Sequence, residues 1–482
     1  MTALRISLLA AILAVGAAVP ASAASRLVVS GAGFGHGIGM SQYGAMGYAQ
    51  QGADHGTILT HYFTGTQLGR LGGASEVRVL LKTSRQMSFS GAAGVAGGRS
   101  LDPAQTYTAV RSLGAAMTLR SASGRDLGSY QAPLAITGSG DGLLVRGRAD
   151  NDVVSGRYRG NLELRPSAIG GVAAINAVGL EDYLRGVVPG EMPPAWPAEA
   201  LRAQAVAART YAIATSKSGD GFEQYADTRS QMYTGIAGER PSTDAAVAAT
   251  RDEIVVYDGK PIVTYYFSTS GGQTENVENS FLGADPAPWL VSVEDPYDAA
   301  SPRHRWTKRM TLRGAKRRLG SLLKGQLRQI KVLRRGRSPR VVRAEIVGTG
   351  GRTRVNGPQL RSKLGLYDTW ARFTVITSRS TRGDGNRPTA APGGSTTTGG
   401  TTPRIFARFS AVALPVAGTI RGRVTGAAAG SLVFVQRHEP SGWVTQLTVP
   451  ARAGGIYAAD VLRPGLYRVR HGGAAGPVVR VR

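Results

Sequence analysis

Glu191 is the residue whose setting best suits acid–base chemistry. It lies between Gly190 and Pro193, just before a segment with helical spacing. Because glycine and proline favour a turn, the carboxyl can project from the chain into a cleft. The same position suits a carboxyl that caps the following helix or forms an ion pair at its N-terminus. This stretch alone leaves both roles open.

Two glycine-rich segments could bring polar groups close to a ligand. Residues Ser268–Glu275 form a polar loop directly after a hydrophobic run, and backbone donors in such a loop can approach a ligand, although an ordinary turn has the same composition. Between Gly31 and Gly39 glycine occupies every second position, so one face of the segment carries no side chains. A ligand or another backbone is expected against that face. The polar groups beside it are His36, Ser41 and Gln42.

Other common catalytic patterns are absent from the sequence. Its six histidines include no pair with the glutamate and the i,i+4 spacing of a zinc hydrolase helix. There is no Gly-Xaa-Ser-Xaa-Gly elbow and no Walker-type phosphate loop. Cysteine is also absent, which excludes thiolate metal sites, disulfides and a cysteine nucleophile.

The charge of the chain points to a polyanionic partner. Its 58 Lys and Arg residues against 31 Asp and Glu give a net charge of +27, which suits nucleic acid, an acidic membrane surface or an anionic cell wall. Sixteen Lys and Arg residues and no acidic residue occur between Ala299 and Ala344. This run is either a solvated face or a dedicated contact with a polyanion.

The first 24 residues indicate which of these polyanionic partners the protein meets. Residues 1–24 have the pattern of a secretory signal peptide, with Arg5, an apolar run and the small-residue site Ala21-Ser22-Ala23. We therefore expect a secreted protein, extracellular or associated with the cell wall, with no membrane span after cleavage and no nucleic acid as partner. Carboxylates and phosphates of anionic wall polymers would attract its Lys and Arg residues.

The elements around these motifs predict an α+β fold. Residues Val77–Val188 read as mostly strand, helices are expected over Pro197–Ser216 and Ser242–Thr250, and strands over Glu253–Tyr257 and Ile262–Ser268. Helices and strands do not alternate regularly, which argues against a parallel α/β fold. We expect a main domain over residues 25–378 and a flexible Thr/Gly/Ser/Pro linker over 379–403. Residues 404–482 then form a small all-β, sandwich-like domain that serves for attachment or as a spacer.

The three motifs, together with Asp227–Tyr233 and Val355–Leu366, resemble the stage II sporulation protein D family, the SpoIID/LytB peptidoglycan proteins. The resemblance covers nearly all of residues Leu27–Ile376. It implies an α+β domain with mixed and antiparallel sheets and a few helices.

The order of the segments departs from the family pattern. In typical members the Gly-His-Gly-Xaa-Gly-Met-Ser-Gln segment, here Gly35–Gln42, follows the strand equivalent to Ala371–Ile376, whereas here it opens the predicted mature chain. A circular permutation would produce this order. We therefore expect residues Val28–Phe34 to lie beside Phe373–Ile376, with the site assembled from both ends of the domain.

The resemblance implies a lytic transglycosylase that cleaves peptidoglycan glycan strands between N-acetylmuramic acid and N-acetylglucosamine, on peptide-free strands, with a 1,6-anhydro product. Its catalytic residue would be Glu191. One carboxyl suffices, because the C6 hydroxyl of the sugar replaces the second carboxylate of a hydrolase. Burial against Trp196 and Met192 would raise the pKa of Glu191, and a helix N-terminus would lower it.

The remaining site residues follow from the same resemblance. The residues expected to bind substrate are Trp196, Gln204, Arg209, Tyr211, Ser268, Ser270, Thr274, His36, Ser41 and Gln42. Arg209 could instead be a buried partner of a carboxylate. Some relatives bind zinc through a histidine where this chain has Phe267, and through cysteines, so we expect no metal and no cofactor.

The sequence also leaves open a second function, which is not enzymatic. The family includes amidase enhancers, so the chain could be a non-catalytic wall-binding protein that acts with other wall hydrolases. The intact motif around Glu191 favours the enzyme.

Overall fold

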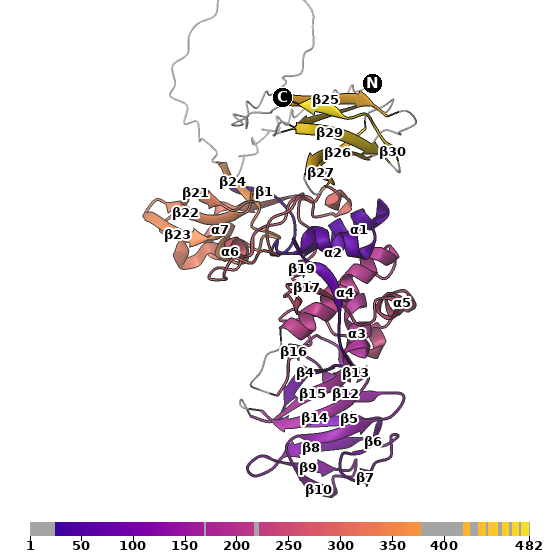
Figure 1. Cartoon of the computed structure of the whole chain (residues 1–482). Coiled ribbons are helices and arrows are strands. Elements are labelled where there is room, and N and C mark those ends of the chain that lie inside the picture. The colour runs from indigo at the N-terminus through magenta and orange to yellow at the C-terminus, as the bar shows by residue number, and fades with distance from the viewer. Residues whose placement is uncertain are drawn as a thin grey trace, which may run out of the picture. The chain divides into compact units, whose positions relative to one another are not determined.

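The computed structural model describes residues 25–167, 170–215 and 221–376, and in the C-terminal part 418–424, 432–439, 442–451, 456–461, 465–471 and 474–481. The predicted signal peptide (1–24) and linker (379–403) lie outside these ranges. The chain divides into two compact units, Met1–Arg382 and Gly383–Arg482, each treated by itself below. Figure 1 shows the elements along the chain.

Two sheets that share one core make up the β-rich part of the first unit. Alternate residues of β4 (Glu76–Ser84), namely Val77, Val79 and Leu81, are buried in this core. The six-stranded sheet has the order β10-β9-β8-β5-β12-β13 and the seven-stranded sheet the order β16-β4-β15-β14-β11-β6-β7. The other strands are β5 (Gln86–Ser90), β6 (Ala92–Val95), β7 (Arg99–Ser100), β8 (Tyr107–Arg111), β9 (Ala116–Arg120), β10 (Asp126–Gln131), β11 (Leu134–Gly138), β12 (Leu143–Arg148), β13 (Val154–Tyr158), β14 (Asn161–Pro166), β15 (Val172–Gly179) and β16 (Gln224–Tyr225).

A buried helix organises the next part of this unit. Most residues of α4 (Ala198–Ala214) are buried, and its alanines let neighbouring helices pack closely on several sides. Those neighbours are α1 (Gln42–Gln50), α2 (His55–Tyr62), α3 (Leu180–Glu191) and α5 (Pro241–Ala249), and β17 (Glu253–Tyr257) also contacts α4. The expected positions of α4, α5 and β17 are therefore confirmed within one or two residues.

Two boundaries were predicted wrongly. The strand-like stretch ends at Gly179 and not at Val188, because Leu180, Tyr183, Leu184 and Val187 bury one face at helical spacing in α3. The expected strand Ile262–Ser268 is reduced to β19 (Tyr266–Phe267), while β18 (Lys260–Pro261) pairs with β17. Thr264 explains part of this, since its hydroxyl donates to the carbonyl of Ala207 in α4.

The two ends of the first unit meet in one sheet. Strand β1 (Arg26–Ala32) lies between β20 (Arg305–Thr311) and β24 (Ala371–Ile376), antiparallel to both. Val28 is opposite Thr374 and Val29 opposite Phe373, so the expected pairing is confirmed (Figure 1). The circular permutation that suggested the pairing stays a prediction.

A third region carries the basic run. Its sheet has the order β21-β22-β23, with β21 (Leu327–Arg335), β22 (Val341–Gly348) and β23 (Gly351–Asn356). Helices α7 (Leu312–Leu319) and α8 (Gly357–Leu364) share a core with this sheet. The remaining elements of the unit are β2 (Met40–Ser41), β3 (Gln67–Arg70), α6 (Val277–Ser280) and short 3-10 helices at Ile236–Gly238, Asp298–Ala300 and Gly320–Leu322.

The described part of the second unit contains strands and no helix. Strands β25 (Gly418–Arg423) and β28 (Ile456–Val461) form one pair. A second sheet contains β26 (Leu432–Glu439), β27 (Gly442–Pro450), β29 (Gly465–His471), β30 (Ala474–Ala475) and β31 (Val479–Val481). The whole chain is thus α+β, with mostly antiparallel sheets. Among the residues that the structure describes, no helix combines the length and apolar character needed to cross a bilayer.

We predict that Gly44→Ala destabilises the protein by about 1–3 kcal/mol, the usual cost of overpacking. A Cβ at Gly44 in α1 would lie 2.0 Å from the Tyr62 hydroxyl and 2.3 Å from the Asp295 carboxylate oxygens. Urea denaturation of purified protein measures the effect. The matched control is Gly56→Ala in α2, where a Cβ meets only ordinary contacts at 3.4 Å and beyond. Equal stability of the two variants would contradict the packing argument.

Candidate active site

Glu191 lines a cavity of about 540 Å³ in the first unit. Five of the residues singled out in the sequence line this cavity together: Glu191, His36, Gln42, Tyr211 and Ser268. The other lining residues are Phe34, Gly35, Thr228, Ser230, Tyr265, Tyr266, Phe267 and Phe281. The cavity therefore joins residues from the start of the described chain to residues from its middle.

Glu191 is the last residue of α3 and is half-buried. Its Oε1 accepts a hydrogen bond of 2.8 Å from the backbone N–H of Met232. The amide of Gln42 donates to the Glu191 backbone carbonyl at 3.0 Å and to Gln204 Oε1 at 3.3 Å. Because α4 begins only at Ala198, Glu191 does not cap that helix, and the alternative of a structural cap is ruled out.

Burial raises the pKa of the Glu191 carboxyl above its ordinary value. Hydrogen bonds from the Met232 N–H, the Tyr266 hydroxyl and the Gln42 side chain act in the opposite direction but do not cancel the burial. The carbonyls at the C-terminal end of α3 carry partial negative charge, which also favours the protonated acid. Glu191 is thus a carboxyl with a raised pKa that also has hydrogen-bond donors in place for the anion.

A chain of side-chain hydrogen bonds orients Tyr266 against Glu191. The Tyr183 hydroxyl donates to Gln231 Oε1 at 3.0 Å, and Gln231 Nε2 donates to the Tyr266 hydroxyl oxygen at 2.9 Å. Since that oxygen already accepts, the Tyr266 proton is free to point to the carboxyl. The sequence analysis gave Tyr266 no role.

His36 is held as a neutral imidazole. The Ile38 N–H donates to its Nδ1 at 3.1 Å, so the proton is on Nε2, which donates to the Tyr266 carbonyl at 3.1 Å. Burial, followed by the charge of Arg361, lowers the pKa of His36 to about 3. At neutral pH His36 therefore offers no charge to a ligand and does not serve as a base.

The glycine segment beside His36 packs against the protein itself. A Cβ at Gly37 would lie 2.4 Å from Arg340 Nε, and one at Gly39 would lie 2.1 Å from the Tyr265 carbonyl. Both glycines have positive φ, +86° and +73°, which other residues adopt at a cost. The face without side chains, where a ligand or another backbone was expected, is filled by groups of this chain.

Arg209 does not line the cavity. Its guanidinium is fully buried and forms two hydrogen bonds to the Glu181 carboxylate, at 2.8 and 2.7 Å. It also donates to the carbonyls of Glu253 and Val247. This placement matches the alternative considered for Arg209, a buried partner of a carboxylate, and ties α4 to α3, α5 and β17.

The other expected binding residues make local contacts outside the cavity lining. Gln204 is buried behind Gln42, and the Trp196 ring packs 4.8 Å from the ring of Tyr43. The side chains of the remaining three residues form hydrogen bonds within the protein. Ser41 accepts from the Gly44 N–H, Ser270 donates to the buried Asp298 Oδ2, and Thr274 Oγ1 accepts from the Val293 N–H.

Aromatic side chains are the part of the cavity that the sequence analysis missed. Phe34, Tyr265, Tyr266, Phe267 and Phe281 all line it. One available signal was the run Tyr265-Tyr266-Phe267 immediately before the Ser268 loop. Phe281 directly follows α6 and had no such signal. Apolar walls with few polar groups are typical of sites that bind an organic ligand.

We predict that Glu191 stays protonated above pH 4.5, the ordinary value for glutamic acid. Infrared difference spectra between the wild type and Glu191→Gln, taken across a pH series, isolate the C=O band of this acid. Tyr266→Phe removes a hydrogen bond that favours the anion, so the band should persist to still higher pH in that variant. Loss of the band at or below pH 4.5 would contradict the raised pKa.

Parts of this chain are similar to known proteins. The family model of the stage II sporulation protein matches residues 168–257, which include Glu191 and Tyr211. Stage II sporulation protein D of Bacillus subtilis is 33% identical over 233 residues, 44% of this chain and 66% of that protein, just under two thirds of its length. The amidase enhancer of Bacillus subtilis is 37% identical over 124 residues, 26% of this chain and 16% of that protein. The chain belongs to the stage II sporulation protein D (SpoIID/LytB) family.

Proposed function

We propose that this protein is a secreted lytic transglycosylase that cleaves peptide-free peptidoglycan between N-acetylmuramic acid and N-acetylglucosamine. One observation carries the proposal: Glu191 is the single carboxyl among the residues that line the cavity, and burial raises its pKa. Its family is associated with cell-wall peptidoglycan hydrolysis, which supports the substrate class.

A single carboxyl suits an intramolecular reaction better than hydrolysis. Glycosidases that use water ordinarily place two carboxylates around the scissile bond. In the proposed reaction protonated Glu191 gives its proton to the glycosidic oxygen as the bond from C1 to that oxygen breaks. The C6 hydroxyl of the same muramic residue bonds to C1 and returns its proton to Glu191. The products are a 1,6-anhydro end and a free hydroxyl on N-acetylglucosamine, and no water is consumed.

The groups around Glu191 support each half of this cycle. Burial favours the protonated acid needed before cleavage, and the Met232 N–H and Tyr266 hydroxyl stabilise the carboxylate formed afterwards. The aromatic rings of Phe34, Tyr265 and Phe281 offer apolar faces for sugar rings. Tyr211 and Ser268 add hydroxyls that can bond to sugar hydroxyls or acetamido groups.

The similarity to an amidase enhancer favours a second candidate. In this alternative the protein binds glycan in the same cavity without cleaving it and acts on the wall through other wall hydrolases. The raised pKa of Glu191 argues for the enzyme, since a ligand contact alone needs no stored proton.

We predict that Glu191→Gln lowers formation of anhydro-muramic ends by about 10²- to 10⁴-fold, the usual contribution of a positioned acid–base group. Glutamine keeps the volume and a hydrogen-bonding oxygen but delivers no proton, so glycan binding should survive. Mass spectrometry of purified peptide-free glycan after incubation measures the product, and a pull-down with the same glycan measures binding.

Glu294→Gln is the matched control, since Glu294 is exposed and outside the cavity lining. It makes the same change of charge and should cleave at the wild-type rate. Wild-type cleavage by Glu191→Gln would contradict the enzymatic proposal and favour the binding alternative. Weaker binding with unchanged turnover would make Glu191 a ligand contact.

A further inference from the structure

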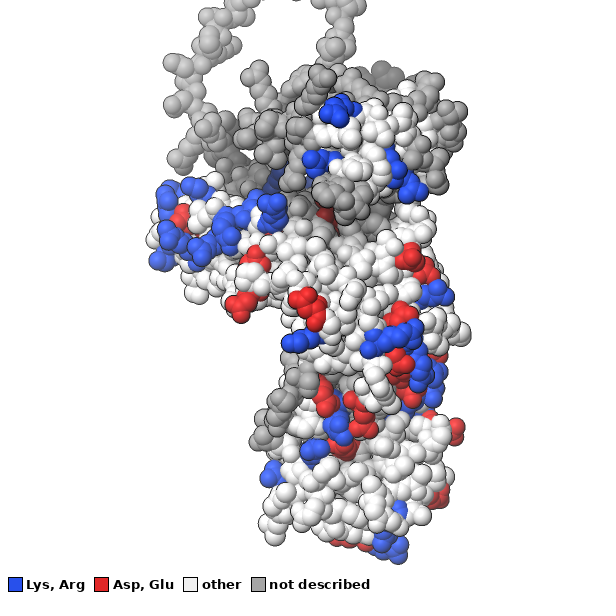
Figure 2. All heavy atoms as spheres, in the orientation of Figure 1, with Lys and Arg blue, Asp and Glu red and all other residues white. Residues whose placement is uncertain are grey.

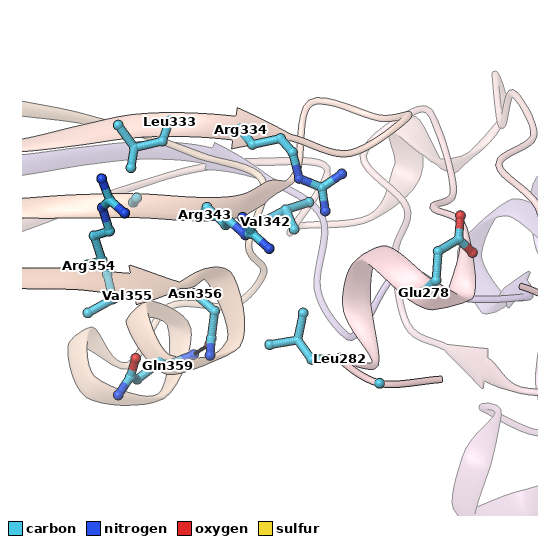
Figure 3. Close-up of a pocket in the computed structure, with 12 residues that line it drawn as sticks. Glu278, Leu282, Leu333, Arg334, Val342, Arg343, Arg354, Val355, Asn356 and Gln359 are labelled. Atoms are coloured by element: carbon cyan, nitrogen blue, oxygen red, sulfur yellow. Dashed lines mark hydrogen bonds between the residues drawn. The ribbon is translucent and has the colours of Figure 1, made fainter. Parts of the chain in front are cut away.

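A second cavity, of about 610 Å³, lies beside the β21-β22-β23 sheet. Three arginines line it, Arg334 from β21, Arg343 from β22 and Arg354 from β23. Leu282, in the loop after α6, forms part of the opposite wall (Figure 3). None of the lining residues of the candidate active site takes part in it.

The strand register places two of these arginines directly against each other. Arg334 is opposite Arg343, and Arg343 is in turn opposite Asn356 on β23. Like charges directly opposite on neighbouring strands are destabilising, so the pair costs stability when nothing is bound. An anion between the two guanidiniums would remove that cost.

No acidic side chain in the described ranges forms a salt bridge with Arg334, Arg343 or Arg354. Glu345 is opposite Arg354 on the neighbouring strand, but its carboxylate pairs with Arg352 at 3.3 Å. Glu278, at the edge of the cavity, accepts from Asn276 at 2.9 Å. Figure 2 shows Lys and Arg gathered over this sheet, and the chain has no acidic residue between Ala299 and Ala344.

We propose that this cavity binds a linear polyol phosphate, a polymer in which phosphodiesters alternate with short carbon linkers. Arginine forks bind phosphate oxygens with charge-assisted hydrogen bonds. A phosphodiester has oxygens to accept from Arg334 and Arg343 together, and Arg354, one row along the sheet, receives the next phosphate. Leu282 and Leu333, 51% and 45% exposed, supply apolar contacts for the linkers between phosphates.

The basic sheet is held firmly to the loop that reaches the candidate active site. The buried Glu275 carboxylate accepts from the backbone N–H groups of Arg337 and Ser338 and from the Ser338 hydroxyl. Arg340 forms a buried ion pair with Asp368 and donates to the carbonyl of Ser270. A bound polymer would therefore hold the protein in a fixed orientation on the layer that contains the polymer, whether or not Glu191 is catalytic.

The test is fluorescence anisotropy of the full chain with a labelled glycerol-phosphate oligomer. Arg334→Gln/Arg343→Gln should weaken binding by about tenfold or more, since the change removes the charge-assisted hydrogen bonds of two guanidiniums to the phosphate. The matched control, Arg313→Gln/Arg317→Gln, removes two exposed charges of α7 from the same basic run and should bind nearly as the wild type does. Arg343→Lys, which keeps the charge and loses the fork, should fall between them.

Two results would overturn the proposal. Equal losses in both double variants would show that the net charge of the run, and not this cavity, attracts the polymer. A labelled poly-glutamate of equal charge that binds as tightly, with the same dependence on Arg334 and Arg343, would assign the cavity to carboxylates. Because no glycan is present, either result leaves the assay of Glu191 unaffected.

Discussion

The close approach of the Gly31–Gly39 segment to its neighbours is the constraint on which the first unit depends. Side chains at Gly37 or Gly39 would collide with Arg340 and with the Tyr265 backbone. Only a chain without those side chains can pass between the basic region and the strand that carries the aromatic residues. That passage places His36 and Gln42 at the cavity and lets Gln42 reach the backbone of Glu191.

Electrostatics at Glu191 follow from this packing. The carboxyl is withdrawn from water by aromatic side chains, and the donors that remain near it are few and fixed by other parts of the fold. Tyr266 is aligned through Gln231 by Tyr183, whose hydroxyl lies in the core. The result is a carboxyl whose protonated form is favoured by burial and whose anion has hydrogen-bond donors in place.

Sequence reasoning succeeded where a local pattern dictates the structure. The alanine-rich helix α4 and the strand Glu253–Tyr257 were predicted from composition and periodicity. The pairing of β1 with β24, which are distant in the chain, was predicted only through the motif order of the family that the sequence resembles. Sequence reasoning failed for individual side-chain contacts between residues that are distant in the chain. Nothing near Arg209 indicates that Glu181 neutralises it, and nothing near Tyr266 indicates that Gln231 orients it. These contacts depend on how helices and loops pack, which local residue types do not determine.

The position of β1 between β20 and β24 also sets the order in which the unit can be completed. Strand β1 precedes both of its partners by most of the length of the unit. Until those strands pair with it, β1 is an unpaired strand with apolar residues Leu27 and Val29 that end fully buried. Contacts so distant in the sequence slow folding. We therefore expect closure of this sheet late in folding, and before it closes this segment is open to aggregation or to chaperones.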